Sequence, residues 1–200
     1  MGIQTIPATG GGLTVSDLIG AEKIELIEEY KSTSNVTSIT FSNIPQTYSK
    51  LLLVANAITT ANDNTNIRVR PNSDSTSGNY QFETDFEEQG GSGSHIFTTY
   101  NSGRSEFQLN QQGNNASGNI YSFRFEILNY TTTAAKLVNW TLHYTPTGGY
   151  NRSREIAFGS YRSGSTTNAV TSLNILTQSG SSSITIPSAV NASLILFGVK

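Results

Sequence analysis

Apolar and polar side chains alternate with a period of two over much of this chain. Between residues 119 and 127, four large apolar side chains fall on one face of an extended backbone: Tyr121, Phe123, Phe125 and Ile127. Residues 136–144 repeat the pattern with Val138, Trp140, Leu142 and Tyr144. Successive side chains of a strand point to opposite faces, whereas a helical face repeats every three to four residues. These segments are therefore predicted to be half-buried antiparallel β-strands.

Similar short segments recur along the chain and are separated by turn-rich polar stretches. We predict strands at about 22–31, 36–42, 50–59, 65–70, 79–87, 95–100, 104–109, 119–129, 136–145, 153–162, 171–177, 182–186 and 193–199. Many short strands at close spacing are typical of a sandwich or a barrel. No linker divides residues 21–200, a length that suits one domain. The prediction is an all-β, jelly-roll-like two-sheet β-sandwich.

Residues 1–20 have a different character. Pro7 and the glycines at 10–12 exclude a regular helix or a central strand there. The stretch nevertheless carries more apolar side chains than a freely solvated tail would have. We predict an extended N-terminal arm that contacts other protein chains through Ile3, Ile6, Pro7, Leu13 and Val15.

Two predicted strands have apolar side chains on both faces. In residues 50–58, Leu52 and Val54 alternate with other apolar side chains, and in residues 193–200 Ile195 and Phe197 do the same. Strands that read this way are covered on both faces. The cover for Leu52, Val54, Ile195 and Phe197 is expected to be the arm, a long loop or a neighbouring subunit. A neighbouring subunit predicts a homo-oligomer, either a trimer or a dimer.

Charge and composition exclude several classes of function. The formal net charge is −2, which provides no electrostatic attraction to nucleic acid or to an anionic membrane. No apolar run approaches about 18 residues, so we expect no membrane partner. The chain has no cysteine and two histidines, His95 and His143, too few for a zinc site. We expect no metal and no cofactor.

One strand places three carboxylates on the same face. Glu83, Asp85 and Glu87 are spaced roughly 6.6 Å apart along a strand, which suits a solvated acidic face, a cation site or a glycosidase pair. If residues 71–78 form a hairpin, Arg68 and Arg70 become cross-strand neighbours of these carboxylates. Such pairing favours the solvated face. Elsewhere in the chain there is no nucleophile elbow and no phosphate-binding loop. We predict no catalytic residue.

A mixture of aromatic, amide and guanidinium groups occurs in one predicted loop. Tyr150, Asn151 and Arg152 follow a Pro-Thr-Gly-Gly turn signal. Such a set suits a sugar, whose apolar face stacks on the ring while its hydroxyls accept hydrogen bonds. These residue types are also common at protein interfaces. They form the candidate glycan loop.

Residues 23–58 resemble a recurrent domain in structural proteins of tailed bacteriophages. The resemblance is carried by a strand, a turn and a motif formed by Ser38, Thr40, Phe41, Ile44, Pro45, Tyr48, Leu51 and Leu53. Residues 66–80 and 184–200 resemble later strands of the same domain, although Phe197 and Val199 depart from its usual last strand. The family resemblance implies a β-sandwich in a phage particle, on the capsid surface or at a tail-fibre tip.

The resemblance and the arm together give the leading functional expectation. It is a non-enzymatic virion protein, made in the host cytoplasm, that decorates and cements the capsid. Its expected partners are the major capsid protein or another virion protein. The alternative is a receptor-binding tail-fibre-tip module that recognises host glycan, and a third hypothesis is a glycan-cleaving enzyme that uses the acidic strand.

Overall fold

A computed structural model describes residues 23–31, 34–61, 65–90, 93–110, 120–145, 152–162, 168–177, 183–186 and 192–200. Within these ranges every regular element is a strand. The strands are β1 (Ile24–Tyr30), β2 (Ser38–Phe41), β3 (Lys50–Thr60), β4 (Ile67–Pro71), β5 (Tyr80–Gly90), β6 (Gly93–Arg104), β7 (Phe107–Gln108), β8 (Ile120–Leu128), β9 (Lys136–Thr145), β10 (Arg152–Tyr161), β11 (Leu173–Thr177), β12 (Ile184–Thr185) and β13 (Ser193–Val199).

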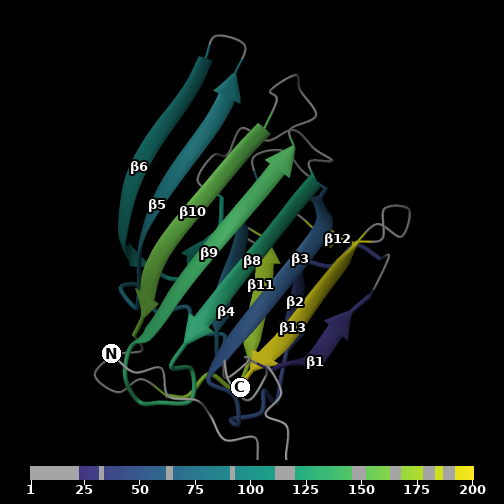
Figure 1. The fold of residues 1–200 in the computed structure, drawn as a ribbon, viewed down its shortest axis with the longest axis vertical. Helices are drawn as coiled ribbons and strands as arrows, with labels where there is room; N and C mark the ends of the chain where they lie inside the picture. The colour runs from purple at the N-terminus through teal and green to yellow at the C-terminus, as the bar shows by residue number, and fades with distance from the viewer. Residues whose placement is uncertain are drawn as a thin grey trace, which may run out of the picture.

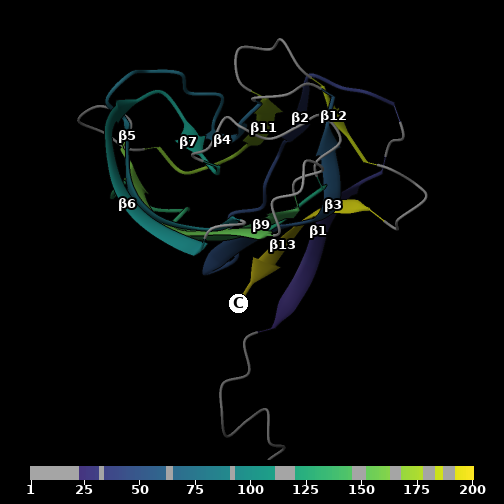
Figure 2. The same ribbon diagram turned by 90° about the horizontal axis from the view of Figure 1, so that it is seen from above.

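The strands form two antiparallel sheets. The larger sheet has the order β1-β13-β3-β8-β9-β10-β5-β6, with β12 also paired to β3, and the smaller has the order β2-β11-β4-β7 (Figure 1). Seen from above, the larger sheet curls around the smaller one, so its outer face is convex (Figure 2). The predicted all-β, two-sheet sandwich is confirmed. The finer jelly-roll assignment stays a prediction, and the arm at 1–20 lies outside the described residues.

The alternation that predicted the central strands also decides which side chains are buried. Along β8 the residues from Tyr121 to Ile127 alternate between buried and more exposed, and their partners on β9 do the same. The buried set faces the smaller sheet. One face of each strand therefore forms the core, as a half-buried antiparallel sheet requires.

Aromatic rings from both sheets meet at the centre of the sandwich. Phe107 of β7 contacts the rings of Tyr80, Phe125 and Trp140, with ring centroids 5.0, 5.6 and 5.8 Å away. The Trp140 indole Nε1 donates a hydrogen bond of 3.2 Å to the Leu109 carbonyl oxygen. The short strand β7 thus places a ring between the two sheets. The hydrogen bond from the indole holds the backbone just after β7 against the larger sheet. Aromatic pairs of this kind add about 0.5–1.5 kcal/mol to the burial of their area.

The hairpin considered between β4 and β5 does not form. β4 pairs with β11 on one side and β7 on the other, so neither of its edges remains for β5. The Asn72 side chain fixes the end of β4 to a distant segment: its Oδ1 accepts from the Thr171 amide at 2.8 Å, and its Nδ2 donates to the Ala169 carbonyl at 2.9 Å. The chain between β4 and β5 therefore crosses from the smaller sheet to the larger one.

Tyr130 fixes the corner at residues 44–48. Tyr130 donates from its hydroxyl to the Pro45 carbonyl oxygen and accepts from the Tyr48 amide at 3.3 Å. The Tyr48 ring lies against Gly198 of β13, where an added Cβ would overlap the ring. Gly198 is thus a position where the backbone and the Tyr48 ring approach closely, a common reason for glycine inside a strand.

Candidate functional site

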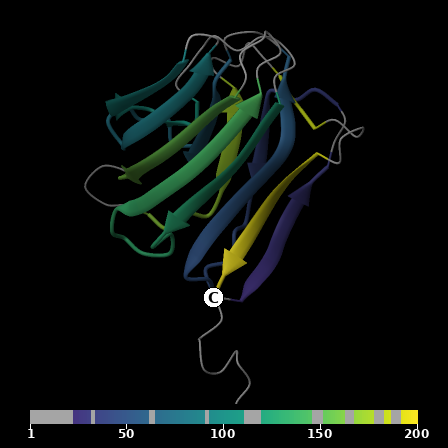
Figure 3. The ribbon, with the colours of Figure 1, turned by 45° about the horizontal axis from the view of Figure 1, so that its top comes forward.

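The four residues predicted as an oligomer or cover face lie together on the outer face of the larger sheet. Phe197 of β13 is opposite Leu52 of β3, and Ile195 is opposite Val54. Leu52 is buried, whereas the other three are half-buried. Their grouping at one lateral edge of the sheet can be followed in Figure 3, where β1, β13 and β3 lie side by side.

Two residues that sequence reasoning did not select extend this surface onto β1. Leu26 is opposite Phe197 and Ile24 is opposite Val199, and their exposed fractions are 59% and 56%. Ile27 points to the other face of the strand and packs against the core. A register shift between Leu26 and Glu28 places Tyr30 opposite the buried Leu194, so Tyr30 packs against the core as well. We call this surface the β1 face, defined by Ile24, Leu26, Leu52, Val54, Ile195 and Phe197.

Charged groups lie beside the β1 face on β8 and at the start of β1. On β8, Arg124 forms an ion pair with Glu126, the residue opposite Leu52. At the start of β1, Glu25 binds the ammonium groups of Lys23 and Lys200 at 2.6 and 3.0 Å. These contacts lower the pKa of Glu25 to about 2, with the hydrogen bond from Lys23 as the largest cause. An apolar centre with a polar rim is the usual anatomy of a protein interface.

The free edge of β1 forms the outer border of the β1 face. Among the described strands, β1 pairs only with β13, so one row of its backbone amide and carbonyl groups faces outward. The strand carries Glu25, Glu28 and Glu29. Charges along an edge strand oppose uncontrolled pairing with other chains.

The acidic strand is a solvated face, as favoured from the sequence. Glu83 and Asp85 of β5 are exposed and Glu87 is half-buried. Asp85 accepts a hydrogen bond of 2.7 Å from the Thr98 hydroxyl, and Glu87 lies 3.4 Å from the Arg154 guanidinium. Within the described ranges there is no cluster of three acidic or histidine side chains able to hold a metal ion.

The arginines expected to neutralise that face have another partner. Arg68 and Arg70 of β4 both form ion pairs with Glu106, whose carboxylate is almost fully buried. These side chains belong to the smaller sheet, whereas the acidic strand belongs to the larger one. The expected pairing of Arg68 and Arg70 with the acidic strand is therefore wrong, because the hairpin on which it depended does not form.

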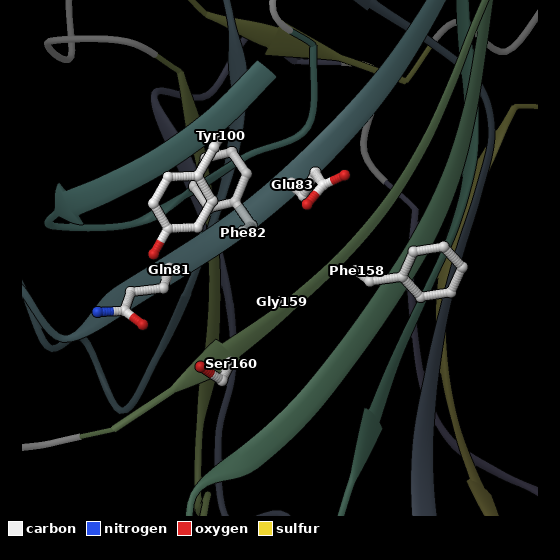
Figure 4. A pocket seen from close by; sticks show the side chains of 7 residues that line it. All are labelled: Gln81, Phe82, Glu83, Tyr100, Phe158, Gly159 and Ser160. Carbon is white, nitrogen blue, oxygen red and sulfur yellow. The ribbon is translucent and has the colours of Figure 1, made fainter. Parts of the chain in front are cut away.

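A shallow groove lies on the outer face of the larger sheet at the end remote from β1. Its lining comes from β5, β6 and β10: Gln81, Phe82, Glu83, Tyr100, Phe158, Gly159 and Ser160. Its volume is about 380 Å³. In Figure 4, Glu83 lies between the rings of Tyr100 and Phe158, with Gln81 and Ser160 to one side.

Sequence reasoning missed this groove. It selected Glu83 as part of the acidic strand, but the ring-bearing residues Tyr100 and Phe158 belong to strands far apart along the chain. The one signal in the sequence is the alternation of β10, which places Phe158 with Arg154 and Ser160 on the outward set. A large ring on an outward position of a two-layer sandwich is a residue that the fold does not require.

The candidate glycan loop and the arm are not placed. Tyr150, Asn151 and the arm residues Ile3, Ile6, Pro7, Leu13 and Val15 lie outside the described residues. Of the loop, the backbone of Arg152 is described: it begins β10 and is opposite Gln89 of β5. No helix in the described part of the chain is long and apolar enough to span a membrane.

Comparisons with family models, curated proteins and solved structures find no match to this chain.

Proposed function

We propose that this protein is a non-enzymatic structural protein of a tailed-bacteriophage virion, where it acts as a capsid decoration (cement) protein. The observation that carries the proposal is the β1 face. It supports a protein whose work is to bind other chains. The resemblance of residues 23–58 to phage structural domains is the reason for proposing a phage particle.

The exposure of the β1 face supports assembly. Leu26 and Ile24 present more than half of their surface to water, beside the half-buried Phe197. Covering apolar surface contributes about 25 cal/mol per Å², and monomers rarely leave such side chains grouped together. A second copy, giving a dimer or a trimer, or another virion protein such as the major capsid protein would cover them.

The proposed mechanism is mechanical. A rigid sandwich seated over a junction between shell subunits resists their separation, and the arm at 1–20 adds contacts on a neighbour by strand addition. Each contact is modest. Repetition over a symmetric shell raises the total through avidity.

The alternative function is a receptor-binding module at a tail-fibre tip, which recognises host glycan through Tyr150, Asn151 and Arg152. The two functions differ in stoichiometry, because a shell surface carries far more equivalent sites than a tail. Quantifying the protein in purified particles therefore separates the cement from the tail module.

Substitutions in the β1 face test the proposal directly. We expect Ile24→Ser combined with Leu26→Ser to dissociate the oligomer and to weaken binding to undecorated particles at least tenfold, about 1.4 kcal/mol. Sedimentation velocity and a particle co-sedimentation assay measure the two effects. Both positions are exposed in the protomer, so the substitutions should not disturb its fold, and the melting temperature should fall only by what the oligomer contacts add.

Leu137→Ser is the matched control. Leu137 is a 50% exposed leucine on β9, four strands and about 19 Å from β1 in the same sheet. It should leave both oligomerisation and particle binding unchanged. Equal losses in the control, or unchanged binding in the double variant, would contradict the proposed role of the β1 face.

A further inference from the structure

Two exposed aromatic rings flank one carboxylate in the groove on β5, β6 and β10. Tyr100 is opposite Glu83, and Glu83 is opposite Phe158, so the three side chains form one cross-strand row. The exposed fractions of Tyr100 and Phe158 are 64% and 65%. Because neighbouring strands are about 4.8 Å apart, the two rings stand roughly 10 Å from each other.

Exposed rings at these positions contribute little to folding. An aromatic side chain stabilises a fold mainly through the area that it buries, and both rings leave most of theirs in water. A smaller or polar side chain would serve an outward strand position equally well. The rings are available to a ligand, and their π faces carry partial negative charge that attracts polarised C–H groups.

The polar groups beside the rings offer both acceptors and donors. The Glu83 carboxylate accepts hydrogen bonds between the rings, while the Gln81 amide and the Ser160 hydroxyl, opposite each other in the next row, each donate and accept. Hydrogen bonds from hydroxyl groups to a carboxylate are charge-assisted and strong. Apolar faces with a few convergent polar groups are typical of ligand sites.

The strand geometry holds this set rigidly. A Cβ on Gly159 would lie 2.5 Å from the Gln81 carbonyl oxygen and 2.7 Å from the Phe82 Cβ, so the glycine allows β10 and β5 to approach closely. A register shift in the β5–β6 ladder between Tyr80 and Phe82 bends β6 at the same end of the groove. A site on paired strands loses little conformational entropy when a ligand binds.

Charge decides which ligands suit the groove. Among the described residues, Glu83 forms no ion pair within 4 Å, whereas Asp85 accepts from Thr98 and Glu87 pairs with Arg154. Arg162 follows β10 beyond Ser160, outside the groove lining. A uronate, sialate or phosphate would place its negative charge beside the carboxylate of Glu83. A basic peptide would find one available carboxylate.

We propose that the Tyr100–Glu83–Phe158 groove binds a short stretch of a neutral glycan chain. Two pyranose rings stack their C–H faces on Tyr100 and Phe158. The hydroxyls between them donate to Glu83 and exchange hydrogen bonds with Gln81 and Ser160. The site binds without cleaving, because hydrolysis needs two carboxylates that flank the bond, and the groove lining holds Glu83 alone.

This inference does not depend on the proposed function. The groove is separated from the β1 face by β8 and β9 in the sheet order, so a decoration protein or a tail module can carry it. It also differs from the candidate glycan loop, which contributes no lining residue.

Affinity gel electrophoresis of the full chain tests the inference. The probes are soluble neutral polysaccharides: a glucan, a mannan and a galactan. Polyuronate and oligolysine, tested separately, represent the two charged classes of ligand. We expect at least one neutral polymer to retard the protein, and neither charged polymer to do so. Tyr100→Ala and Phe158→Ala should each weaken that retardation at least tenfold, and Glu83→Gln several-fold.

Two further variants separate stacking from other causes. Phe158→Leu keeps apolar bulk but removes the π face, so it should weaken binding almost as much as Phe158→Ala. Ile120→Ala removes an exposed side chain of the same sheet from β8, two strands away from β10, and it should bind as the unmodified protein does. All variants should retain the thermal transition of the parent, because these side chains are exposed.

The inference is overturned by absence of retardation in every neutral polymer or by retardation only in polyuronate or oligolysine. Full binding by both ring variants, or an equal loss in Ile120→Ala, also overturns it. Shortening of the bound polymer would overturn the assignment of a site that binds without cleaving.

Discussion

At the scale of single residues, Asp74 shows how one side chain holds a crossing loop. The Asp74 carboxylate accepts hydrogen bonds from the Thr76 amide at 2.9 Å, the Asn79 amide group at 2.7 Å and the Tyr161 hydroxyl at 2.9 Å. Burial alone would raise the pKa of Asp74, but these hydrogen bonds outweigh it, and the pKa lies below the ordinary 3.8. The ionised carboxylate is therefore favoured by folding.

The lowered pKa of Asp74 predicts an acid-sensitive contribution to stability. As the pH falls below about 3.8, the unfolded chain takes up the proton first, so the free energy of unfolding falls until the folded carboxyl is also protonated. We expect Asp74→Asn to lower the free energy of unfolding at neutral pH by about 1–3 kcal/mol. The variant should also flatten the pH dependence in this acid range, as measured by urea unfolding at several pH values.

The control for Asp74 is Asp85→Asn, which changes an exposed carboxylate with one hydrogen bond and should cost within about 0.5 kcal/mol. Glu25 and Glu126, whose pKa values are also lowered, titrate in the same acid range. Their contributions are the same in the parent and in Asp74→Asn, so they cancel when the two pH dependences are subtracted. If the free energy of unfolding falls as steeply with acid in Asp74→Asn as in the parent, the role given to Asp74 is contradicted.

At the scale of elements, the position of strands was predictable and their pairing was not. The alternation of Phe123 and Phe125 with polar residues determines a strand and its buried face, whatever the neighbour. β4 carries an equally clear pattern, yet its partner β11 lies about a hundred residues away in sequence. Local periodicity contains no information about such a distant partner, so the pairing of β4 cannot be predicted from its own sequence.

The same pairing explains the buried ion pairs on β4. Glu106 precedes β7 and binds the guanidinium groups of both Arg68 and Arg70, whose side chains are 18% and 21% exposed. Removing the shared carboxylate charge leaves two partly buried cations without a counter-charge. We expect Glu106→Gln to lower the free energy of unfolding by about 2–4 kcal/mol in urea titrations.

The matched control is Glu87→Gln, since Glu87 pairs with Arg154 where the side chains are 42% and 52% exposed. Exposed pairs contribute about 0–1 kcal/mol, so this variant should remain near the parent. Similar losses in the two variants would mean that burial of the Glu106 pairs adds nothing.

At the scale of the whole molecule, the class of fold could be predicted from the sequence. The candidate sites could be predicted only in part. Leu52, Val54, Ile195 and Phe197 were selected because apolar residues on both faces of a strand are unusual, and they lie together as expected. The extension of the β1 face onto β1 could not be predicted, because it depends on the pairing of Leu26 with Phe197. The groove is formed where three strands meet, and no single strand contributes more than three of its seven lining residues.

The division of labour between the sandwich and the arm leads to the last prediction. Within the described residues, the core cluster runs from Ile39 to Leu196, with Ile27 packed against it, so a hydrophobic core exists without residues 1–15. Deleting residues 1–15 should therefore leave the thermal unfolding transition nearly unchanged. The deleted segment carries Ile3, Ile6, Leu13 and Val15, which are predicted to bind neighbouring chains, so incorporation into particles should be lost.

Particle decoration and calorimetry, performed on the same deletion variant, separate these two roles. Tyr150→Ala provides the comparison, because it changes the candidate glycan loop and should reduce adsorption to host cells without affecting decoration if that loop binds glycan. Normal decoration by the arm-deleted protein would remove the arm from the assembly mechanism and leave the β1 face as its basis. A large fall in the melting temperature would instead show that residues 1–15 belong to the folded core, because an arm that binds only neighbouring chains contributes nothing to the stability of the isolated sandwich.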